Sequence, residues 1–175
     1  MPARIEGEPM PAKHQTQVDR TSAKELVVTR IFNAPPRIVF AAWTTPELLL
    51  RWWAPKSFGV SFLSCEADVR SGGTYRFVFS HPASEEPMAF FGRYLEVEPG
   101  ARLVWTNDEG GEGGSVTTVT FEARGATTLV TMRDRYPSEE ALDQAIASGS
   151  TGGFGESFEQ LDEVLIALDT VPGQG

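Results

Sequence analysis

A long run of alternation with a period of two, from Val60 to Arg133, constrains the fold of this chain more than any other feature. Successive side chains of a β-strand point to opposite faces of a sheet, so alternating apolar and polar residues predict strands with one buried face. Turns rich in glycine and proline divide the run. We therefore predict six strands joined as an antiparallel meander, over residues 60–70, 74–80, 88–97, 102–107, 115–123 and 127–133.

Details of this run set further expectations. In the first strand, the spacing places Leu63, Cys65, Ala67 and Val69 on one face. The pair Gly72-Gly73 is typical of a hairpin turn. The segment EGGEGG, residues 109–114, is so rich in glycine that we expect a flexible connection.

The residues before this run predict one more strand and two short helices. Lys24–Phe32 is rich in β-branched residues and has the length of a strand, which brings the expected sheet to seven strands. Pro36 begins a short helix, because proline is tolerated in the first helical turn. Thr45 supplies a capping hydroxyl for a second helix, which starts at Pro46 and ends before Pro55.

The C-terminal part of the chain is helical. Ser138 is expected to cap a helix that continues through Ile146. A longer amphipathic stripe follows, with its apolar residues spaced by three and four, at Phe154, Phe158, Leu161, Leu165 and Leu168. An antiparallel sheet with one apolar face needs a cover, and this helix is the only long candidate. We predict an α+β fold in which the sheet curls around the C-terminal helix.

Composition limits the class of protein. A chain of 175 residues has the length of one domain; we place it at 24–169, with flexible tails at 1–23 and 170–175. A net charge of -9 repels phosphate backbones and anionic lipids, so we expect neither nucleic acid nor membrane as a partner. Cys65 is the only cysteine, which excludes an intrachain disulfide. The absence of a signal-like or membrane-spanning segment favours a cytoplasmic location.

The residues that catalysis would need are sparse. The two histidines are His14, in the expected tail, and His81, at a strand end, and the chain has no G-x-S-x-G motif. No spacing of metal ligands or phosphate-loop motif occurs, so we expect no metal and no cofactor. The chain is therefore more consistent with a binding protein than with an enzyme.

Strand arginines leave a second question open. An inward-facing arginine would pair with an acid or hold a ligand's carboxylate or phenolate, whereas outward-facing arginines are commoner. The candidates on predicted strands are Arg70, Arg76, Arg93 and Arg133. Asp68 and Arg70 form a candidate surface pair.

Aromatic residues are the candidate ligand contacts. Trp52 and Trp53 point about 100° apart on a helix, so one can pack in the core while the other lines a cavity or lies exposed; alternatively, both anchor the helices to the sheet. A row of strand residues, Tyr75, Phe77 and Phe79, forms either a pocket wall or a dry core with other side chains. The full set of predicted ligand-binding residues is Trp52, Trp53, Tyr75, Phe77, Phe90, Trp105, Met132, Phe154 and Phe158.

Glycines precede or begin the covering helix. Because a glycine has no side chain, such residues either leave room for a ligand and permit a hinge, or simply break the helix. They are Gly149, Gly152, Gly153 and Gly155.

Four separated motifs resemble one known family. They are R-x-F-x-A-P-x-x-x-V-F at Arg30–Phe40, W-T-x-P-E-x-L-x-x-W-W-x-P at Trp43–Pro55, D-x-R-x-G-G-x-Y at Asp68–Tyr75 and G-x-Y-x-E-x-x-P at Gly92–Pro99. Together with the order of elements, these motifs are similar to the activator of Hsp90 ATPase homologue 1-like family, in the START/Bet v 1-like (SRPBCC) superfamily. The resemblance covers about residues 24 to 169.

The resemblance implies a helix-grip fold whose sheet and C-terminal helix enclose a cavity for an apolar small molecule. Members of the superfamily include lipid carriers, polyketide cyclases, stress-response proteins and co-chaperone domains, and fold alone does not choose among them. Our expectation is non-enzymatic binding of an apolar or aromatic molecule such as a lipid or polyketide. The alternatives are a polyketide cyclase or hydrolase using an arginine, Tyr75 or His81, and an Hsp90 co-chaperone-like module. Eukaryotic activators of Hsp90 carry an additional N-terminal domain that binds the chaperone, so we do not expect Hsp90 as a partner. The sequence does not distinguish a monomer from a homodimer.

Overall fold

The computed structural model describes residues 15–54, 56–83, 85–108, 114–147 and 154–169. The segments 1–14 and 170–175 of the expected tails, with His14, lie outside the described residues, as do Gly149, Gly152, Gly153 and most of EGGEGG. The elements in chain order are β1 Gln17–Arg20, β2 Glu25–Phe32, α1 Pro36–Thr44, α2 Pro46–Trp52, η1 Lys56–Phe58, β3 Ser61–Ala67, β4 Thr74–Ser80, β5 Met88–Glu98, β6 Arg102–Thr106, β7 Val116–Arg124, β8 Thr127–Arg135, α3 Glu139–Ala147 and α4 Phe154–Asp169.

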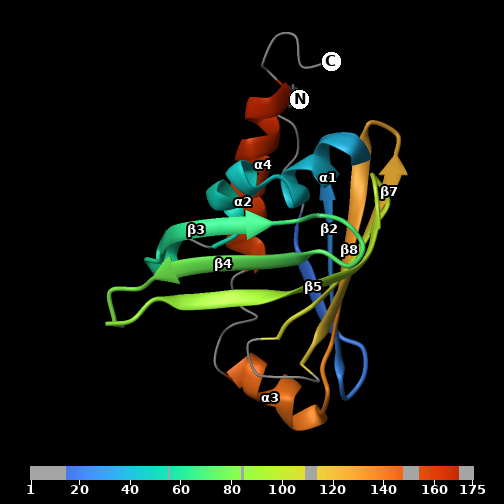
Figure 1. Ribbon diagram of the computed structural model, residues 1–175. Helices are drawn as coiled ribbons and strands as arrows, with labels where there is room; N and C mark the ends of the chain where they lie inside the picture. The colour runs from blue at the N-terminus through green and yellow to red at the C-terminus, as the bar shows by residue number, and fades with distance from the viewer. Residues whose placement is uncertain (1–14, 55, 84, 109–113, 148–153, 170–175) are drawn as a thin grey trace, which may run out of the picture.

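The strands form one antiparallel sheet in the order β1-β2-β8-β7-β6-β5-β4-β3. Strands β3 to β8 therefore make the expected meander, and β2 closes against β8 through eight paired residues from Glu25 to Phe32. Strong twist turns β3, β4 and β5 across the direction of β2, β7 and β8 (Figure 1). This curvature leaves a concave face, and α4 runs along it.

The described sheet has eight strands rather than the seven expected. The additional strand, β1, lies within residues 1–23, where we expected only a flexible tail. All four of its residues are exposed, so it carries no apolar alternation that could reveal it. Its register with β2, from Gln17 opposite Thr29 to Arg20 opposite Leu26, comes from backbone pairing. The folded part of the chain thus starts before residue 24.

The alternation expected for β3 is wrong at its start. A bulge between Phe62 and Ser64 shifts the register, because two residues of β3 oppose one of β4 there. Leu63 is consequently 58% exposed. Phe62 instead turns inward and packs against the core beside Cys65 and Ala67. One inserted residue has exchanged the faces of neighbouring side chains.

The predicted helices are present with one change in capping. Helices α1 and α2 begin at Pro36 and Pro46, as their prolines indicate. Thr45 occupies the N-cap position of α2, but its hydroxyl makes no capping hydrogen bond. At α3 the expected cap is formed, because the Ala141 N–H donates to the Ser138 hydroxyl at 3.1 Å.

Helix α4 covers the concave face and packs against α1 and α2. Its side chains Phe158 and Leu161 are buried against the sheet, and Phe158 meets Phe32 edge-to-face with ring centroids 5.3 Å apart. Complete burial of such a side chain stabilises the fold by about 1.5–3 kcal/mol. Among the described residues, none of the helices is long and apolar enough to cross a membrane.

Candidate functional site

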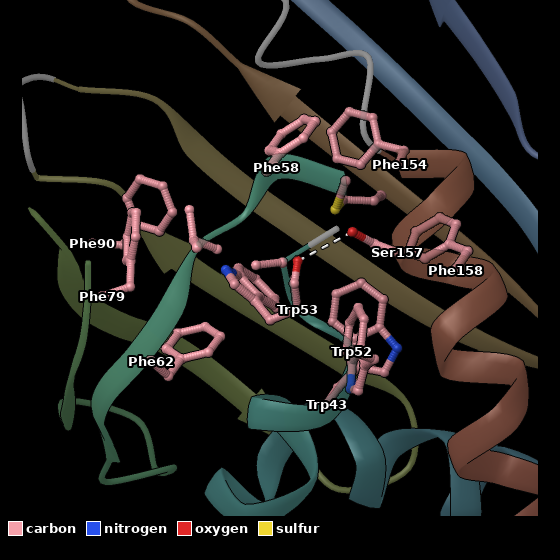
Figure 2. Close-up of a pocket in the computed structure, with 13 residues that line it drawn as sticks. Trp43, Trp52, Trp53, Phe58, Phe62, Phe79, Phe90, Phe154, Ser157 and Phe158 are labelled. Atoms are coloured by element: carbon pink, nitrogen blue, oxygen red, sulfur yellow. Dashed lines mark hydrogen bonds between the residues drawn. The ribbon is translucent and has the colours of Figure 1, made fainter. Parts of the chain in front are cut away.

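A cavity of about 240 Å³ lies between the sheet, the end of α2 and the start of α4. Figure 2 shows its side chains converging from these elements on one space. Nine of its thirteen lining residues are aromatic and a single one, Ser157, has a polar aliphatic side chain, so the walls attract apolar molecules. The lining consists of Trp43, Trp52, Trp53, Ala54, Phe58, Val60, Phe62, Phe79, Phe90, Met132, Phe154, Ser157 and Phe158.

Both residues of the tryptophan pair line this cavity, and they differ in burial. Trp52 is 2% exposed, and its indole N–H donates to the Ala42 carbonyl at 3.0 Å, which ties α2 to α1. Trp53 is half-buried and stands near the middle of the lining in Figure 2. The division into one core tryptophan and one cavity tryptophan therefore holds in part, because the buried Trp52 also touches the cavity.

The structure separates the remaining predicted ligand contacts into two groups. Phe90, Met132, Phe154 and Phe158 line the large cavity with the tryptophan pair. The other three lie around a second cavity of only about 10 Å³, lined by Trp43, Leu49, Trp53, Tyr75, Phe77, Tyr94 and Trp105. Tyr75, Phe77 and Trp105 therefore belong to a separate and much smaller space.

Several lining residues escaped the sequence analysis. Phe62 was missed because the bulge in β3 reverses its direction. Phe58 was missed because it lies on the short 3-10 helix η1, which has no periodic pattern to indicate a face. Trp43, on α1, was not among the predicted ligand contacts, although it lines both cavities. The remaining unpredicted lining residues are Ala54, Val60, Phe79, noted only as part of the aromatic row, and Ser157.

Polar side chains of α4 hold the segment between α2 and β3 against the cavity. The Gln160 side chain accepts from the Lys56 N–H at 2.9 Å and donates to the carbonyls of Trp52 and Ala54 at 3.2 and 3.0 Å. The Ser157 hydroxyl donates to the Trp53 carbonyl at 3.2 Å. These bonds satisfy backbone groups that would otherwise lose partners at the end of α2.

Glu156 adds a charged contact one turn earlier. Its carboxylate accepts from the Ser57 hydroxyl at 2.5 Å and from the Ser57 N–H at 2.9 Å. These hydrogen bonds hold the pKa of Glu156 below its usual value, with the hydroxyl as the largest cause. The segment that carries Trp53 and Phe58 is therefore fixed to α4 by polar bonds outside the apolar cavity.

The buried arginine of this sheet is Arg30, which was not among the four strand candidates. It is 2% exposed, and its guanidinium donates to both carboxylate oxygens of Asp162 on α4, at 2.8 and 2.6 Å. The guanidinium also lies 4.8 Å from the centre of the Phe32 ring. This bidentate pair joins β2 to α4, so its charge is compensated within the protein.

The four strand arginines considered as ligand contacts all lie on the surface, which is the commoner, outward-facing arrangement. Arg70 pairs with Asp68 at 2.8 Å beside the Gly72-Gly73 turn, with both side chains more than half exposed. The others contact neighbours on the outer face: Arg76 over the Phe91 ring, Arg93 with Asp108, and Arg133 with Glu25. The large cavity is lined by none of them.

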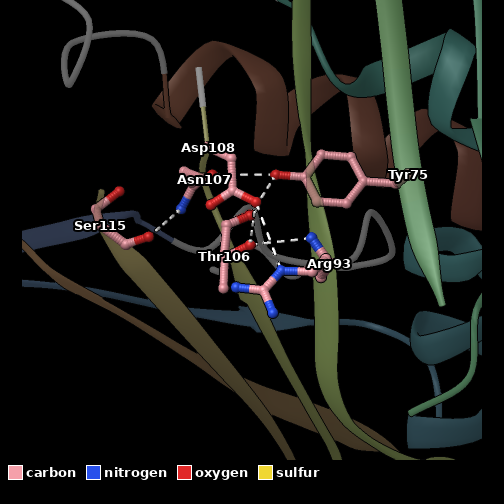
Figure 3. Close-up of polar contacts among 6 residues, drawn as sticks. All are labelled: Tyr75, Arg93, Thr106, Asn107, Asp108 and Ser115. Carbon is pink, nitrogen blue, oxygen red and sulfur yellow. Dashed lines mark hydrogen bonds and ion pairs between the residues drawn. The ribbon is translucent and has the colours of Figure 1, made fainter. Parts of the chain in front are cut away.

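Tyr75, which lines the smaller cavity, also belongs to a polar network with residues of β5 and of the end of β6 (Figure 3). The Tyr75 hydroxyl donates to the Thr106 carbonyl at 2.7 Å and contacts the Asn107 side chain at 3.3 Å. Tyr75 pairs with Gly92 across the strands, and a side chain at Gly92 would meet the Thr106 carbonyl oxygen at 2.0 Å. Glycine is therefore required at position 92, where β5 approaches the Thr106 carbonyl of β6.

Burial raises the pKa values of two titratable groups, Cys65 and Tyr94. Burial raises the pKa of the Cys65 thiol to about 11, and the nearby Glu47 adds to the shift. Burial also raises the pKa of Tyr94, with Cys65 as a minor cause. Both groups are therefore neutral near pH 7, and the thiol is a poor nucleophile. His81 lies outside the cavity lining and accepts a hydrogen bond from the Ala83 N–H at 2.9 Å.

Comparison with solved structures finds close relatives of this fold. A protein from Rhodobacter sphaeroides is 28% identical, with a TM-score of 0.80 and coverage of 88% of this chain and 99% of that chain. A protein from Arthrobacter aurescens is 26% identical, with a TM-score of 0.74 and coverage of 86% and 91%. An AHSA1-like protein from Aeromonas hydrophila, 20% identical over 76% of this chain and 92% of that chain, shares the fold with a TM-score of 0.58.

Two comparisons were made with the sequence of the chain. The first finds no curated protein that matches it. The family model described as activator of Hsp90 ATPase homolog 1-like protein matches residues 33–166, which is most of the 175 residues. The curved antiparallel sheet gripping α4 is the helix-grip arrangement of the START/Bet v 1-like superfamily. With the fold and the family model in agreement, this chain belongs to the activator of Hsp90 ATPase homolog 1-like family.

Proposed function

We propose that the protein binds a small, neutral, aromatic molecule without covalent chemistry, in the large cavity beneath the start of α4. The observation that carries this proposal is the lining, in which aromatic side chains from the sheet, α1, α2, η1 and α4 surround about 240 Å³ of space. The free energy falls when apolar walls contact an apolar ligand in place of water. Aromatic walls add stacked and edge-to-face contacts for an aromatic one.

The size of the cavity favours a compact ligand. Ligand pockets commonly enclose roughly 300–1,000 Å³, so this one lies just below the usual range. A long-chain lipid would leave much of its chain in water, whereas a molecule of two fused rings fits within the walls. The lining residues that the structure describes include no lysine, arginine, aspartate or glutamate, which favours a neutral ligand over an ion.

The lining also supports binding over the enzymatic alternative. A general acid or base must lie within hydrogen-bond reach of the reacting atom. Neither His81 nor Tyr75 lines the large cavity, and the Tyr75 hydroxyl is directed to the Thr106 carbonyl. Among the described lining residues, Ser157 is the one that carries a hydroxyl, and no histidine is among them to activate it.

Titration of the purified protein with naphthalene tests the proposal directly. All four tryptophans of the chain line one or both cavities, so their fluorescence should change as the ligand binds. Indole and hexadecanoic acid extend the panel to a second two-ring molecule and to a lipid. We expect saturable changes with the two-ring compounds and a weaker response to the fatty acid.

A pocket-filling variant supplies the control. Val60→Phe places a ring in the lining and should weaken naphthalene binding about tenfold, because overpacked space must be reopened. Val18→Phe makes the same change on the exposed strand β1 and should leave binding unchanged. Failure of every compound to bind, or equal binding by both variants, would remove the proposal.

A further inference from the structure

Trp53 stands between two cavities that otherwise adjoin. It lines the large cavity of about 240 Å³ and also the small one of about 10 Å³. Among the residues that the structure describes, Trp43 is the one other residue common to the two linings. The small cavity has room for about one water-sized group, so in this position of Trp53 it admits no ring.

The Trp53 ring is held by packing alone. Its centroid lies 5.4 Å from that of Phe77, in an edge-to-face contact, and 6.2 Å from that of Trp105. The indole N–H donates to no acceptor among the residues that the structure describes, whereas the backbone carbonyl accepts from Ser157. Trp53 is half-buried and follows the last residue of α2. Rotation of its side chain therefore breaks no hydrogen bond and leaves the backbone in place.

The small cavity has one lining donor that lacks an acceptor. The Trp43 indole N–H is buried and has no hydrogen-bond partner among the residues that the structure describes. An unpaired buried donor costs about 1–3 kcal/mol, so an oxygen atom placed beside it would relieve an existing penalty.

We propose that Trp53 is the residue that sets ligand size: its rotation joins the two cavities and admits an elongated aromatic molecule whose acceptor oxygen reaches the indole N–H of Trp43. This inference rests on the function proposed above, because it concerns the same site. With Trp53 in the position described here, the site accepts a molecule of two fused rings. An elongated molecule must first displace the Trp53 ring, which lowers its apparent affinity by the fraction of protein in the open arrangement.

Three neutral probes test the inference. Naphthalene fits the outer cavity, flavone is longer and carries a carbonyl oxygen, and 2-phenylnaphthalene is longer without an acceptor. Dissociation constants are measured for the wild-type protein and for Trp53→Ala, with Trp53→Leu as a second variant in case alanine prevents folding. We expect the affinity for flavone, relative to that for naphthalene, to rise about tenfold in the Trp53 variants.

Two control variants sharpen the result. Phe58→Ala also removes a ring from the large cavity but lies outside the small one, so it should not change the ratio of the two affinities. Trp43→Phe, combined with Trp53→Ala, should weaken flavone about tenfold more than it weakens 2-phenylnaphthalene, because only flavone carries an acceptor for the Trp43 N–H.

The outcomes separate the two proposals. If neither naphthalene nor indole binds the wild-type protein, the proposed function itself fails. If naphthalene binds but the Trp53 variants weaken naphthalene and flavone equally, Trp53 is an ordinary wall residue and the inference alone is overturned. The same holds if Phe58→Ala raises the preference for flavone as strongly as the Trp53 variants do.

Discussion

The pair formed by Arg30 and Asp162 is the residue-scale contact on which the position of α4 depends. The Arg30 side chain is 1% exposed and that of Asp162 is 22% exposed. Each charge is tolerated in this environment because the other compensates it. The Arg30 Nε, which has no hydrogen-bond partner, shows that the site is built around Asp162 rather than around a general polar pocket.

Removing one partner should therefore cost more than removing both. We expect Asp162→Asn to lower the free energy of unfolding by about 3 kcal/mol, because it leaves a buried cation without its anion. The double variant Arg30→Met with Asp162→Leu should recover most of that loss. Urea denaturation measures both. The pair of Arg124 with Glu122, both more than half exposed, is the control, and its disruption should change stability by less than about 1 kcal/mol.

Asp134 provides a residue-scale prediction about pH. Burial raises the pKa of its carboxyl group to about 6, while the hydrogen bond donated by the Thr117 hydroxyl at 2.5 Å opposes the shift. The folded state therefore binds the proton more tightly than the unfolded chain does. The stabilisation from Asp134 is fully present below pH 3.8, the ordinary value, and is lost as pH rises through about 6.

Asp134→Asn should remove this pH dependence, because asparagine resembles the protonated acid. The stability of the variant relative to wild type should rise by about 1–3 kcal/mol between pH 4 and pH 7. Thermal unfolding at a series of pH values measures the difference. A parallel pH profile for the two proteins would show that Asp134 titrates normally. Asp143→Asn, at an exposed position on α3, serves as the comparison.

At the scale of elements, α4 acts through its polar side chains as well as its apolar stripe. The Gln160 side chain makes three hydrogen bonds to backbone groups of Trp52, Ala54 and Lys56. The Glu156 carboxylate accepts two more, from the N–H and the hydroxyl of Ser57. The segment between α2 and β3 has no strand partner of its own there. Its conformation, and with it the placement of two cavity residues, therefore depends on α4.

Replacement of Gln160 should loosen this segment. Gln160→Leu keeps the size of the side chain but leaves the Lys56 N–H and two carbonyls unpaired, which should cost about 1–3 kcal/mol. Amide hydrogen exchange at residues 56–58 should quicken more than exchange in β7 and β8. Glu159→Leu, on the exposed face of the same helix, is the matched control. Uniform quickening throughout the protein would instead indicate general destabilisation.

At the scale of the whole molecule, the cavity is built from parts that are distant in the chain. Its walls come from α1, α2, η1, β3, β4, β5, β8 and α4, so they exist together only in the folded state. A ligand that binds there must stabilise the fold as a unit. Naphthalene at a hundredfold excess over its dissociation constant should raise the free energy of unfolding by about 2.7 kcal/mol.

Chemical denaturation with and without naphthalene checks this coupling. Val60→Phe should show little of the stabilisation, whereas Val18→Phe should show all of it. A stabilisation that appears equally in both variants would mean that naphthalene binds elsewhere on the protein.

The sequence by itself determined the elements and their order. Strand periodicity, the prolines before α1 and α2, and the stripe of α4 are local signals, since each reflects how neighbouring side chains point along one element. These signals, with the motifs from Arg30 to Pro99, were sufficient to predict the α+β fold, the wrapping of the sheet on α4 and the family.

The tertiary structure alone decided which side chains meet. The bulge that turns Phe62 inward, the exposed strand β1 and the pairing of Arg30 with Asp162 depend on register and on partners far along the chain. The separation of Tyr75, Phe77 and Trp105 from the large cavity depends on the position of one side chain, the indole ring of Trp53. No local pattern encodes that position, because it is set by close packing among residues of α1, α2 and three strands.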